Sequence, residues 1–360
     1  MTHNPNHYVL IMAGGIGSRF WPVSKKSFPK QFMDIMGSGE SLLAQTYRRF
    51  THLVPRENIY IITNESYVDL VKEHIPNMAS ENILEEPIAR NTAPCIALAT
   101  FKLRHVNPNA VCIVAPSDHL ITQELVFIEN AAKALHFAEQ QDAILTMGIK
   151  PTRPDTGYGY IQFHADKVEH GIYPVKTFTE KPTEEIARTF IDSGEFLWNA
   201  GIFIWNLKTI LNRFEQHLPE IYEQFDRLDF SSGSFKVDLE RSYSLCPSIS
   251  IDYGIMEKEK NVFVLPANFG WSDLGTWKSL WDVSQKDEKG NAQIGTSQKI
   301  YNTQNTLVYS NTGRLVVING IDNLVVVDSG DVLVIMDKDR EQELKTIAGE
   351  IKDKYKGKYN

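Results

Sequence analysis

Short apolar runs rich in β-branched residues alternate with amphipathic stretches through the first half of the chain. The apolar runs cover residues 8–13, 58–63, 110–115 and 143–148. Segments with apolar positions three and four residues apart lie between them, at 41–52, 92–105 and 124–140. Parallel strands need crossover helices of this kind. The alternation predicts an α/β fold with a doubly wound sheet whose ligands bind beyond the carboxyl ends of the strands.

The pattern changes twice further along. After about Asp155, Gly, Tyr and Pro separate shorter predicted strands at 158–163, 173–178 and 201–205, and we expect an inserted substrate-binding half. From about Gly290 the helical period disappears. Apolar runs at 306–309, 314–318 and 323–327 then alternate with Asn, Gly and Asp, which predicts stacked short strands. Residues 341–360 have a weak helical period and predict a terminal helix. We therefore predict two domains, 1–285 and 286–360.

Charge and cysteine content restrict the possible partners and compartment. Lys and Arg total 37 against 45 Asp and Glu, a formal net charge of -8, which argues against a nucleic-acid partner. A pocket for a small phosphorylated molecule needs only a few cations and N–H groups, so it stays compatible. The three cysteines, Cys95, Cys112 and Cys246, lie far apart in the sequence. We therefore expect each to be a small buried hydrophobic residue, in a protein of a reducing compartment. The run 8–13 is too short for a signal sequence or a membrane span, so we expect a cytoplasmic protein with no membrane partner.

A glycine-rich turn directly follows the first predicted strand, in the string Leu10-Ile-Met-Ala-Gly-Gly-Ile-Gly-Ser-Arg-Phe-Trp-Pro. Glycines there let successive N–H groups converge on phosphate oxygens. The turn lacks the Lys-Ser/Thr of a P-loop, and Phe20 stands where a dinucleotide fingerprint needs a third glycine. A tight strand-to-helix turn explains the glycines equally well. However, Arg19 follows at once, and Phe28-Pro-Lys-Gln-Phe adds Lys30 at what we expect to be the same rim.

These two strings together resemble the signature of the sugar-1-phosphate nucleotidylyltransferases. The resemblance implies a Rossmann-like, doubly wound mixed sheet of the nucleotide-diphospho-sugar transferase type. Gln31 is typical of the branch that acts on mannose 1-phosphate and GTP. The resemblance covers about residues 8–282, implies a catalytic domain in 1–285, and suggests a C-terminal module that could be a left-handed β-helix. A clear hexapeptide repeat is not visible. The implied triphosphate contacts are Ala13, Gly14, Gly15, Gly17, Ser18 and Arg19, with Arg19 and Lys30 also implied to be catalytic.

A second string, Glu85-Glu-Pro-Ile-Ala-Arg-Asn-Thr-Ala-Pro, leads into the predicted helix at 92–105. Base recognition needs edge-matched donors and acceptors, which carboxylates and helix-start amides supply. The string resembles the base-and-ribose segment of the guanylyl branch, which implies contacts from Glu86, Pro87, Arg90, Asn91 and Thr92. An ordinary helix N-terminus with Thr92 as its N-cap explains part of the string, but it does not explain the Arg-Asn pair before the cap. Ser41 is the corresponding candidate N-cap of the predicted helix at 41–52.

Two distant aspartates are candidate metal ligands. Asp118 follows the strand at 110–115, and Asp273 lies in Gly270-Trp-Ser-Asp-Leu-Gly-Thr-Trp. Mg²⁺ held by one or two carboxylates and by substrate phosphates fits this chemistry. An isolated Asp at either place could equally be a cap or a turn residue. Both strings resemble metal-binding motifs of the family, which implies Mg²⁺ as the cofactor and a catalytic role for both aspartates.

Three strings resemble the sugar-binding segments of the family: Thr156-Gly-Tyr-Gly-Tyr-Ile, Phe178-Thr-Glu-Lys-Pro and Trp198-Asn-Ala-Gly-Ile-Phe. Sugar hydroxyls favour Glu or Asn, and a sugar phosphate favours Lys. The implied sugar or sugar-phosphate contacts are Gly157, Glu180, Lys181 and Asn199. Taken alone, the first string could be a strand weakened by glycine, the second a solvated turn, and the third a bend beside a core aromatic residue. Asp252 is a weaker candidate, because it could simply cap a helix.

The resemblance implies transfer of GMP from GTP to mannose 1-phosphate, giving GDP-mannose and pyrophosphate without a covalent intermediate, and a possible homodimer through the C-terminal module. Two rivals stay open. One is a thymidylyl- or uridylyltransferase acting on another hexose 1-phosphate. The other is a non-catalytic nucleotide-sugar sensor of the same fold, which would be expected to lack Lys30, Asp118 or Asp273. A metal-dependent glycosyltransferase shares the architecture but lacks the glycine-loop signature.

Overall fold

The chain forms two compact units in the computed structural model, which describes residues 3–15, 17–168 and 170–359, without the side chain of Ser18. The first, here called the sheet unit, comprises Met1–Gly14, Tyr47–Ser117 and Ile121–Trp271. The second, the β-module unit, comprises Gly15–Thr46, Asp118–Leu120 and Ser272–Asn360. The predicted domain boundary between residues 285 and 286 stays a prediction.

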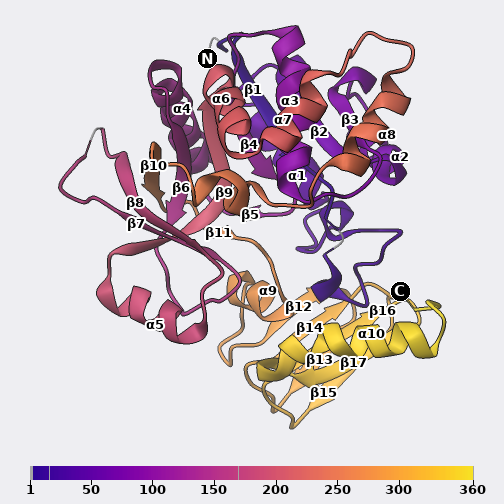
Figure 1. Cartoon of the computed structure of the whole chain (residues 1–360). Helices are drawn as coiled ribbons and strands as arrows, with labels where there is room; N and C mark the ends of the chain where they lie inside the picture. Colours follow the sequence, from indigo (N-terminus) through magenta and orange to yellow (C-terminus); the bar gives the residue numbers. More distant parts are fainter. Residues whose placement is uncertain (1–2, 16, 169, 360) are drawn as a thin grey trace. The chain divides into compact units, whose positions relative to one another are not determined.

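The sheet unit is built on a nine-stranded sheet with the order β3-β2-β1-β4-β9-β6-β10-β8-β7 (Figure 1). Its strands are β1 (His7–Met12), β2 (Ile59–Asn64), β3 (Ile83–Glu86), β4 (Val111–Pro116), β6 (Ile144–Ile149), β7 (Gly159–Phe163), β8 (Tyr173–Glu180), β9 (Phe196–Asn206) and β10 (Val262–Ala267). β1 pairs in parallel with β2 and β4, whereas β9 runs antiparallel between β4 and β6. The predicted mixed α/β sheet is confirmed. Two short strands, β5 (Leu120–Ile121) and β11 (Trp271–Ser272), complete the set before residue 290.

Helices lie between the strands and at the C-terminal end of the chain. The helices are α1 (Leu42–Phe50), α2 (Val68–His74), α3 (Thr92–Val106), α4 (Glu124–Gln140), α5 (Glu184–Ser193), α6 (Leu207–His217), α7 (Pro219–Asp226), α8 (Phe235–Leu245), α9 (Trp277–Val283) and α10 (Leu344–Lys354). Ser41 caps α1 as predicted, because its hydroxyl accepts a hydrogen bond from the Ala44 N–H. The prediction for Thr92 is wrong: Asn91 is the N-cap of α3, and its side chain accepts from the Thr92 N–H at 2.8 Å.

The C-terminal residues form stacked short strands. These are β12 (Ala292–Gly295), β13 (Gln298–Tyr301), β14 (Leu307–Ser310), β15 (Val316–Asn319), β16 (Leu324–Ser329) and β17 (Val332–Asp337). Gln298 pairs in parallel with Val316, and Leu307 with Val325, each 18 positions further along the chain. Equal spacing of this kind is the geometry of a β-helix coil. The predicted β module is therefore confirmed, and its left-handed winding stays a prediction.

Asparagines form corners of this module. Asn302, Asn305 and Asn323 have φ values of 46°, 53° and 58°, in the left-handed region that Asn tolerates better than most residues. The terminal helix α10 lies along the strands, as Figure 1 shows, and buries Leu344 against them. Asn and Gly between short apolar runs thus mark the corners, and the apolar residues fill the interior.

Candidate functional site

Lys30 lies at the centre of the first candidate group, which belongs to the β-module unit. Only 3% of Lys30 is exposed. Its ammonium donates to Asp118 Oδ2 at 2.9 Å and to the carbonyl oxygen of Asp273 at 2.6 Å, and it lies 5.7 Å from the centre of the Phe20 ring. A buried ammonium requires such acceptors, because burial of an unpaired charge is costly. The structure thus brings together three of the four predicted catalytic residues.

Asp118 is an ionised carboxylate that solvent still reaches. Burial by itself would raise its pKa, but the Lys30 ammonium and His119 outweigh burial and hold the pKa of Asp118 below its usual value. About a third of the side chain, 31%, is exposed. Asp273 lies in a tight turn in which its Oδ1 accepts from the Gly275 N–H at 3.0 Å. A negatively charged, accessible oxygen ligand is therefore available beside a fixed cation.

This donor set fits a divalent cation that substrate phosphates help to hold. Carboxylate oxygens are the ligands that Mg²⁺ prefers, usually one or two of them together with phosphate and water. Across residues 3–15, 17–168 and 170–359, no group of three or more His, Cys, Asp or Glu side chains could hold a metal ion. A cation at Asp118 and Asp273 would therefore complete its coordination with substrate or water.

The glycine-rich turn is shared between the two units. In the sheet unit, Ala13 is fixed to β2, because its N–H donates to the Ile62 carbonyl at 2.7 Å and its carbonyl accepts from the Thr63 hydroxyl at 2.8 Å. In the β-module unit, Gly17 has a φ of 68°, and a Cβ there would collide with the Lys30 side chain. Glycine at 17 is therefore required both by the backbone and by the packing of Lys30.

The remaining predicted contacts of the turn are Gly15, Ser18 and Arg19. Gly15 is exposed, and a Cβ there would meet no neighbouring atom. Arg19 is exposed and lies in the short helix η1 (Ser18–Phe20). The Ser18 side chain lies outside the described residues. The proposed triphosphate contacts of these residues stay predictions.

Glu86 ends β3 as a buried carboxyl with two hydrogen-bond donors. Burial raises its pKa to about 7, although hydrogen bonds from Tyr243 and Cys95 act to lower it. The Tyr243 hydroxyl donates to Glu86 Oε1 at 3.2 Å. A Cβ at Gly14 would lie 3.2 Å from Glu86 Oε2, so the first glycine of the turn leaves room for this carboxyl. Two predicted nucleotide contacts from distant strings are therefore neighbours within the sheet unit.

The segment after Glu86 is fixed by the last turn of α8 and by the chain that follows it. Arg90 donates to the carbonyl oxygens of Tyr243 and Ser244 at 3.1 and 3.2 Å. The Thr92 hydroxyl accepts from the Ile251 N–H at 2.9 Å. Arg90 and Thr92 thus hold the segment in place, and direct nucleotide contacts from them, from Pro87 and from Asn91 stay predictions.

A second acidic group lies in the sheet unit. The Glu180 side chain is only 8% exposed; its Oε1 accepts from the Lys181 ammonium at 2.8 Å, and its Oε2 is buried without a hydrogen-bond partner among the described residues. Asn199 Nδ2 donates to Asp252 Oδ1 at 3.0 Å. Burial, followed by the Glu180 charge, raises the pKa of Asp252. An unpaired buried acceptor is costly, so this group is suited to a ligand that donates hydroxyl protons.

Asp252, the weaker candidate from the sequence, thus contacts Asn199, one of the predicted sugar contacts. Asp252 begins a single π-helical turn, η6 (Asp252–Met256), a feature that is frequent at functional sites. Gly159 allows the group to form, because a Cβ there would collide with Glu180 Oε2. Gly157, the predicted contact of the same string, donates its N–H to Asp155 Oδ1 at 2.8 Å.

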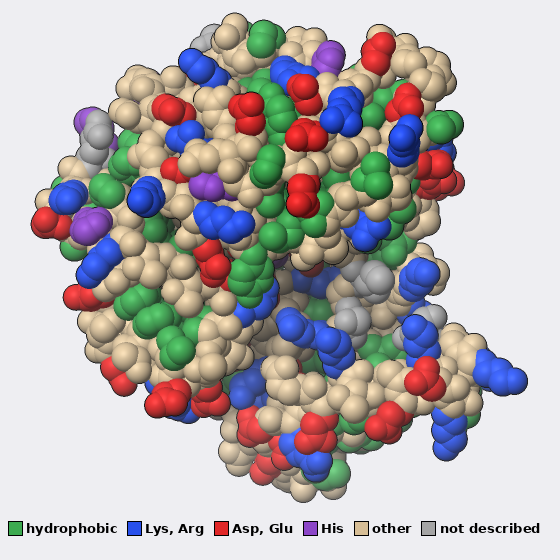
Figure 2. Space-filling view, viewed as in Figure 1, with side chains coloured by type: hydrophobic (Ala, Val, Ile, Leu, Met, Phe, Trp, Pro, Cys, Tyr) green, Lys and Arg blue, Asp and Glu red, His purple; other side chains and the backbone are tan. Residues whose placement is uncertain are grey.

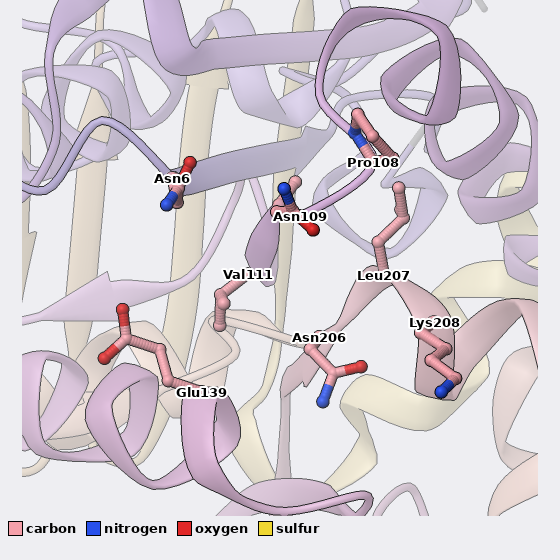
Figure 3. Close-up of a pocket in the computed structure, with 9 residues that line it drawn as sticks. Asn6, Pro108, Asn109, Val111, Glu139, Asn206, Leu207 and Lys208 are labelled. Carbon is pink, nitrogen blue, oxygen red and sulfur yellow. The ribbon is translucent and has the colours of Figure 1, made fainter.

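A separate cavity of about 400 Å³ lies at the amino ends of β1 and β4 (Figure 3). Its polar lining residues bond to their neighbours: Glu139 accepts from Asn4 and contacts His7, and Asn206 donates to two backbone carbonyls. Ligands of doubly wound sheets bind at the opposite, carboxyl ends of the strands. This cavity is therefore not part of the candidate site.

A family model described as Nucleotidyl transferase matches residues 8–290. The chain belongs to the nucleotidyl transferase family. A second model, described as MannoseP isomerase/GMP-like beta-helix domain, matches residues 300–351. The family and the fold class predicted from the motifs are thereby confirmed, including a β-helix-like C-terminal module.

Relatives of this nucleotidyl transferase are similar over most of its length. A mannose-1-phosphate guanylyltransferase of Salmonella muenchen is 39% identical over 311 residues, covering 84% of this chain and 64% of that protein. A putative mannose-1-phosphate guanylyltransferase of Vibrio cholerae is 37% identical, covering 97% and 75%. The chain thus spans less than two thirds of the length of the first relative and three quarters of the length of the second.

A solved structure has the same fold. It is described as a mannose-1-phosphate geranyltransferase from Thermus thermophilus, and it superposes with a TM-score of 0.88 at 31% identity. The match covers 96% of this chain and 99% of that one.

The surface of this nucleotidyl transferase carries interspersed charges of both signs on the face shown in Figure 2. None of the helices in the part of the chain that the structure describes combines the length and the apolar composition that a membrane span requires.

Proposed function

We propose that this chain transfers GMP from GTP to mannose 1-phosphate, forming GDP-mannose and pyrophosphate. The observation that supports it most is the Lys30 cluster, in which one buried ammonium contacts the Asp118 carboxylate and the backbone carbonyl of Asp273. The names of the relatives from Salmonella and Vibrio support the choice of nucleotide and sugar.

The proposed reaction is a direct displacement. An oxygen of mannose 1-phosphate forms a bond to the α-phosphorus of GTP, while the bond from that phosphorus to the bridging oxygen breaks and pyrophosphate leaves with the electron pair. A general base is not needed, because a phosphate monoester with a second pKa of about 6 is mostly a dianion at neutral pH. The protein's task is therefore alignment and charge neutralisation.

Each candidate group has a part in this proposal. Lys30 and Arg19, with the N–H groups of the glycine turn, bind the phosphates of GTP and stabilise the charge on departing pyrophosphate. Glu86 and the segment after it recognise the base and ribose. Asp118 and Asp273 would hold Mg²⁺, whose charge, when bound, reduces the repulsion between two polyanions.

The Glu180 group is proposed to bind the sugar. The buried, unpartnered Glu180 Oε2 would accept a hydroxyl proton of mannose, and the Lys181 ammonium, now bonded to Glu180 Oε1, would bind the sugar phosphate. Asp252 joins these predicted contacts because Asn199 holds it beside Glu180.

Neither a nucleic acid nor a membrane is expected as a partner, and the proposed compartment is the cytoplasm. We also propose a homodimer through the β module. Leu315, Val317, Leu333 and Ile335 are each more than half exposed and line one apolar cavity of about 510 Å³. A second copy of the chain would cover them. Analytical ultracentrifugation tests this: Ile335→Asp should convert a dimer to a monomer, and a monomeric parent protein would contradict it.

A pyrophosphate-release assay tests the reaction. GTP, UTP and TTP are each combined with mannose 1-phosphate or glucose 1-phosphate, with and without Mg²⁺. We expect rapid release only from GTP with mannose 1-phosphate and Mg²⁺. Equal release with UTP or TTP would support the rival nucleotidyltransferase, and no release from any pair would support the non-catalytic sensor.

A further inference from the structure

All four predicted catalytic residues belong to the compact unit that also contains the C-terminal module. Arg19 and Lys30 lie in Gly15–Thr46, Asp118 in the short segment Asp118–Leu120, and Asp273 at the start of Ser272–Asn360. The module is therefore part of the same folded body as the proposed catalytic groups, which raises the question of what it does to them.

Trp21 connects the glycine-rich turn to the end of the chain. Its indole N–H donates to the carbonyl oxygen of Tyr359 at 2.8 Å, and its own carbonyl accepts from the Trp277 indole at 3.3 Å. Trp21 is only 3% exposed. This part of the turn, two residues after Arg19, is thus held from two sides, by the C-terminal turn and by α9.

Aromatic packing carries this connection to Lys30. The rings of Phe20 and Trp277 meet edge to face with centroids 4.9 Å apart, and Trp277 also packs against Tyr309 of β14, at 5.3 Å. Phe20 also contacts the Lys30 ammonium. A shift of Trp21 would therefore move Phe20 and Arg19 and alter the packing around Lys30.

The terminal helix reinforces the same region. α10 packs against η1, and the buried Leu344 of its first turn lines a cavity of about 90 Å³ together with Arg19 and Trp277. The backbone N–H of Lys278 donates to Glu341 Oε2 at 2.7 Å, so α9 is tied to the segment just before α10. The segments that carry Arg19 and Asp273 are thus anchored to the C-terminal module.

We propose that the C-terminal module positions residues 15–32, here called the catalytic loop, through Trp21. The indole N–H of Trp21 is anchored by the backbone carbonyl of Tyr359. Trp21 is a positioning residue in this account, because it acts through Arg19 and Lys30. The kinetic consequence rests on the proposed function, whereas the structural consequence, a loop that loosens when the anchor is lost, does not.

Trp21→Phe tests the anchor, because it keeps an aromatic ring and removes the donor. Trp281→Phe is a matched control: Trp281 lies on α9 in the same unit, and its indole donates to the Gly290 carbonyl at 2.8 Å. Hydrogen exchange of residues 15–32, the melting temperature, kcat and the KM for each substrate are measured for both variants and the parent protein.

We expect Trp21→Phe to speed amide exchange in residues 15–32 and to lower kcat about tenfold, with the KM for mannose 1-phosphate unchanged. Trp281→Phe should lower the melting temperature to a similar extent and leave loop exchange and kcat at parent values. Equal effects of the two variants on exchange would overturn the proposal. If the parent protein forms no product, the proposed function fails while the exchange comparison still decides this inference.

Should Trp21→Phe fail to fold, Tyr359→Ala replaces it. Tyr359 lies in a terminal turn, where its ring packs against Tyr355 at 5.3 Å, so its removal loosens the acceptor without opening the core. We expect faster loop exchange and a smaller fall in kcat, about threefold. Parent-like exchange in this variant would contradict the proposal.

Discussion

Lys30 concentrates the proposed chemistry in one buried cation. Replacing Lys30 by Ala removes the positive charge and leaves Asp118 without its closest cation, so we expect kcat to fall about a hundredfold or more. The exposed Lys26 of the same loop is the control, and Lys26→Ala should stay within about twofold of the parent enzyme. Steady-state pyrophosphate release measures both. A Lys30→Ala variant with parent kcat would remove Lys30 from the account.

Asp252 tests the sugar group. Asp252→Asn keeps the shape of the side chain and removes its charge, so we expect the KM for mannose 1-phosphate to rise about tenfold, the effect of losing one good hydrogen bond. The KM for GTP should stay unchanged. The exposed Asp192 of α5 provides the control Asp192→Asn. Equal increases in both KM values would place Asp252 outside the sugar site.

Glu86 makes folding stability depend on pH. Burial raises its pKa from an ordinary value of 4.5 to about 7, so the native state binds a proton more tightly than the unfolded state does. The contribution of Glu86 to the free energy of unfolding is complete below about pH 4.5. It is lost as the pH rises to about 7, by up to about 1.4 kcal/mol per pH unit. The free energy of unfolding, measured by urea denaturation across this pH range, should change less with pH for Glu86→Gln than for the parent protein. The exposed neighbour variant Glu85→Gln should match the parent, and a Glu86→Gln profile as steep as the parent's would contradict the assignment.

Residue types in local strings predicted that Lys30, Asp118 and Asp273 belong to one group, because each lies in a distinctive string, and the structure makes them neighbours. Asp252 could not be assigned in this way. A lone Asp before a helical segment is commonly an N-cap. Only the tertiary contact with Asn199, 53 positions away, reveals that it faces Glu180.

At the scale of elements, the helices and buried strands were the most predictable features. The predicted helix 124–140 coincides with α4, since its apolar period is continuous over the whole segment. β9 was predicted only from 201, although it begins at Phe196. Asn199 and Gly201 are poor strand formers, and pairing with β4 and β6 overrides that preference. β3 was missed because two of its four residues are glutamates.

The start of α3 provides an element-scale test. Asn91 caps the helix with φ 67° and ψ −169°, a region that glycine occupies most easily. Asn91→Ala keeps the Cβ and loses the cap, so we expect a cost of about 1–2 kcal/mol in the free energy of unfolding. Asn91→Gly also loses the cap but relieves the backbone, and should cost less than half as much. Urea denaturation compares the two, and equal costs would show that the backbone conformation is not the reason for the difference.

At the scale of the whole molecule, the sequence predicts the two kinds of architecture but not how the chain is shared between them. The change of periodicity near Gly290 marks where the stacked strands begin. Local patterns carry no information on the return of residues 15–46 to the C-terminal segment, because that association depends on packing among Trp21, Trp277 and Leu344. The loop that carries Arg19 and Lys30 therefore forms one compact unit with the β module, which periodicity could not reveal.

The stereochemical course of the reaction tests the central claim most directly. GTP with sulfur replacing one α-phosphate oxygen, in a single configuration, is mixed with mannose 1-phosphate, and the configuration at phosphorus in the product is determined by ³¹P NMR. Direct attack at the α-phosphorus predicts a thio-substituted GDP-mannose with inverted configuration. Retained configuration would reveal a covalent enzyme intermediate, and either retention or the absence of this product would contradict the account.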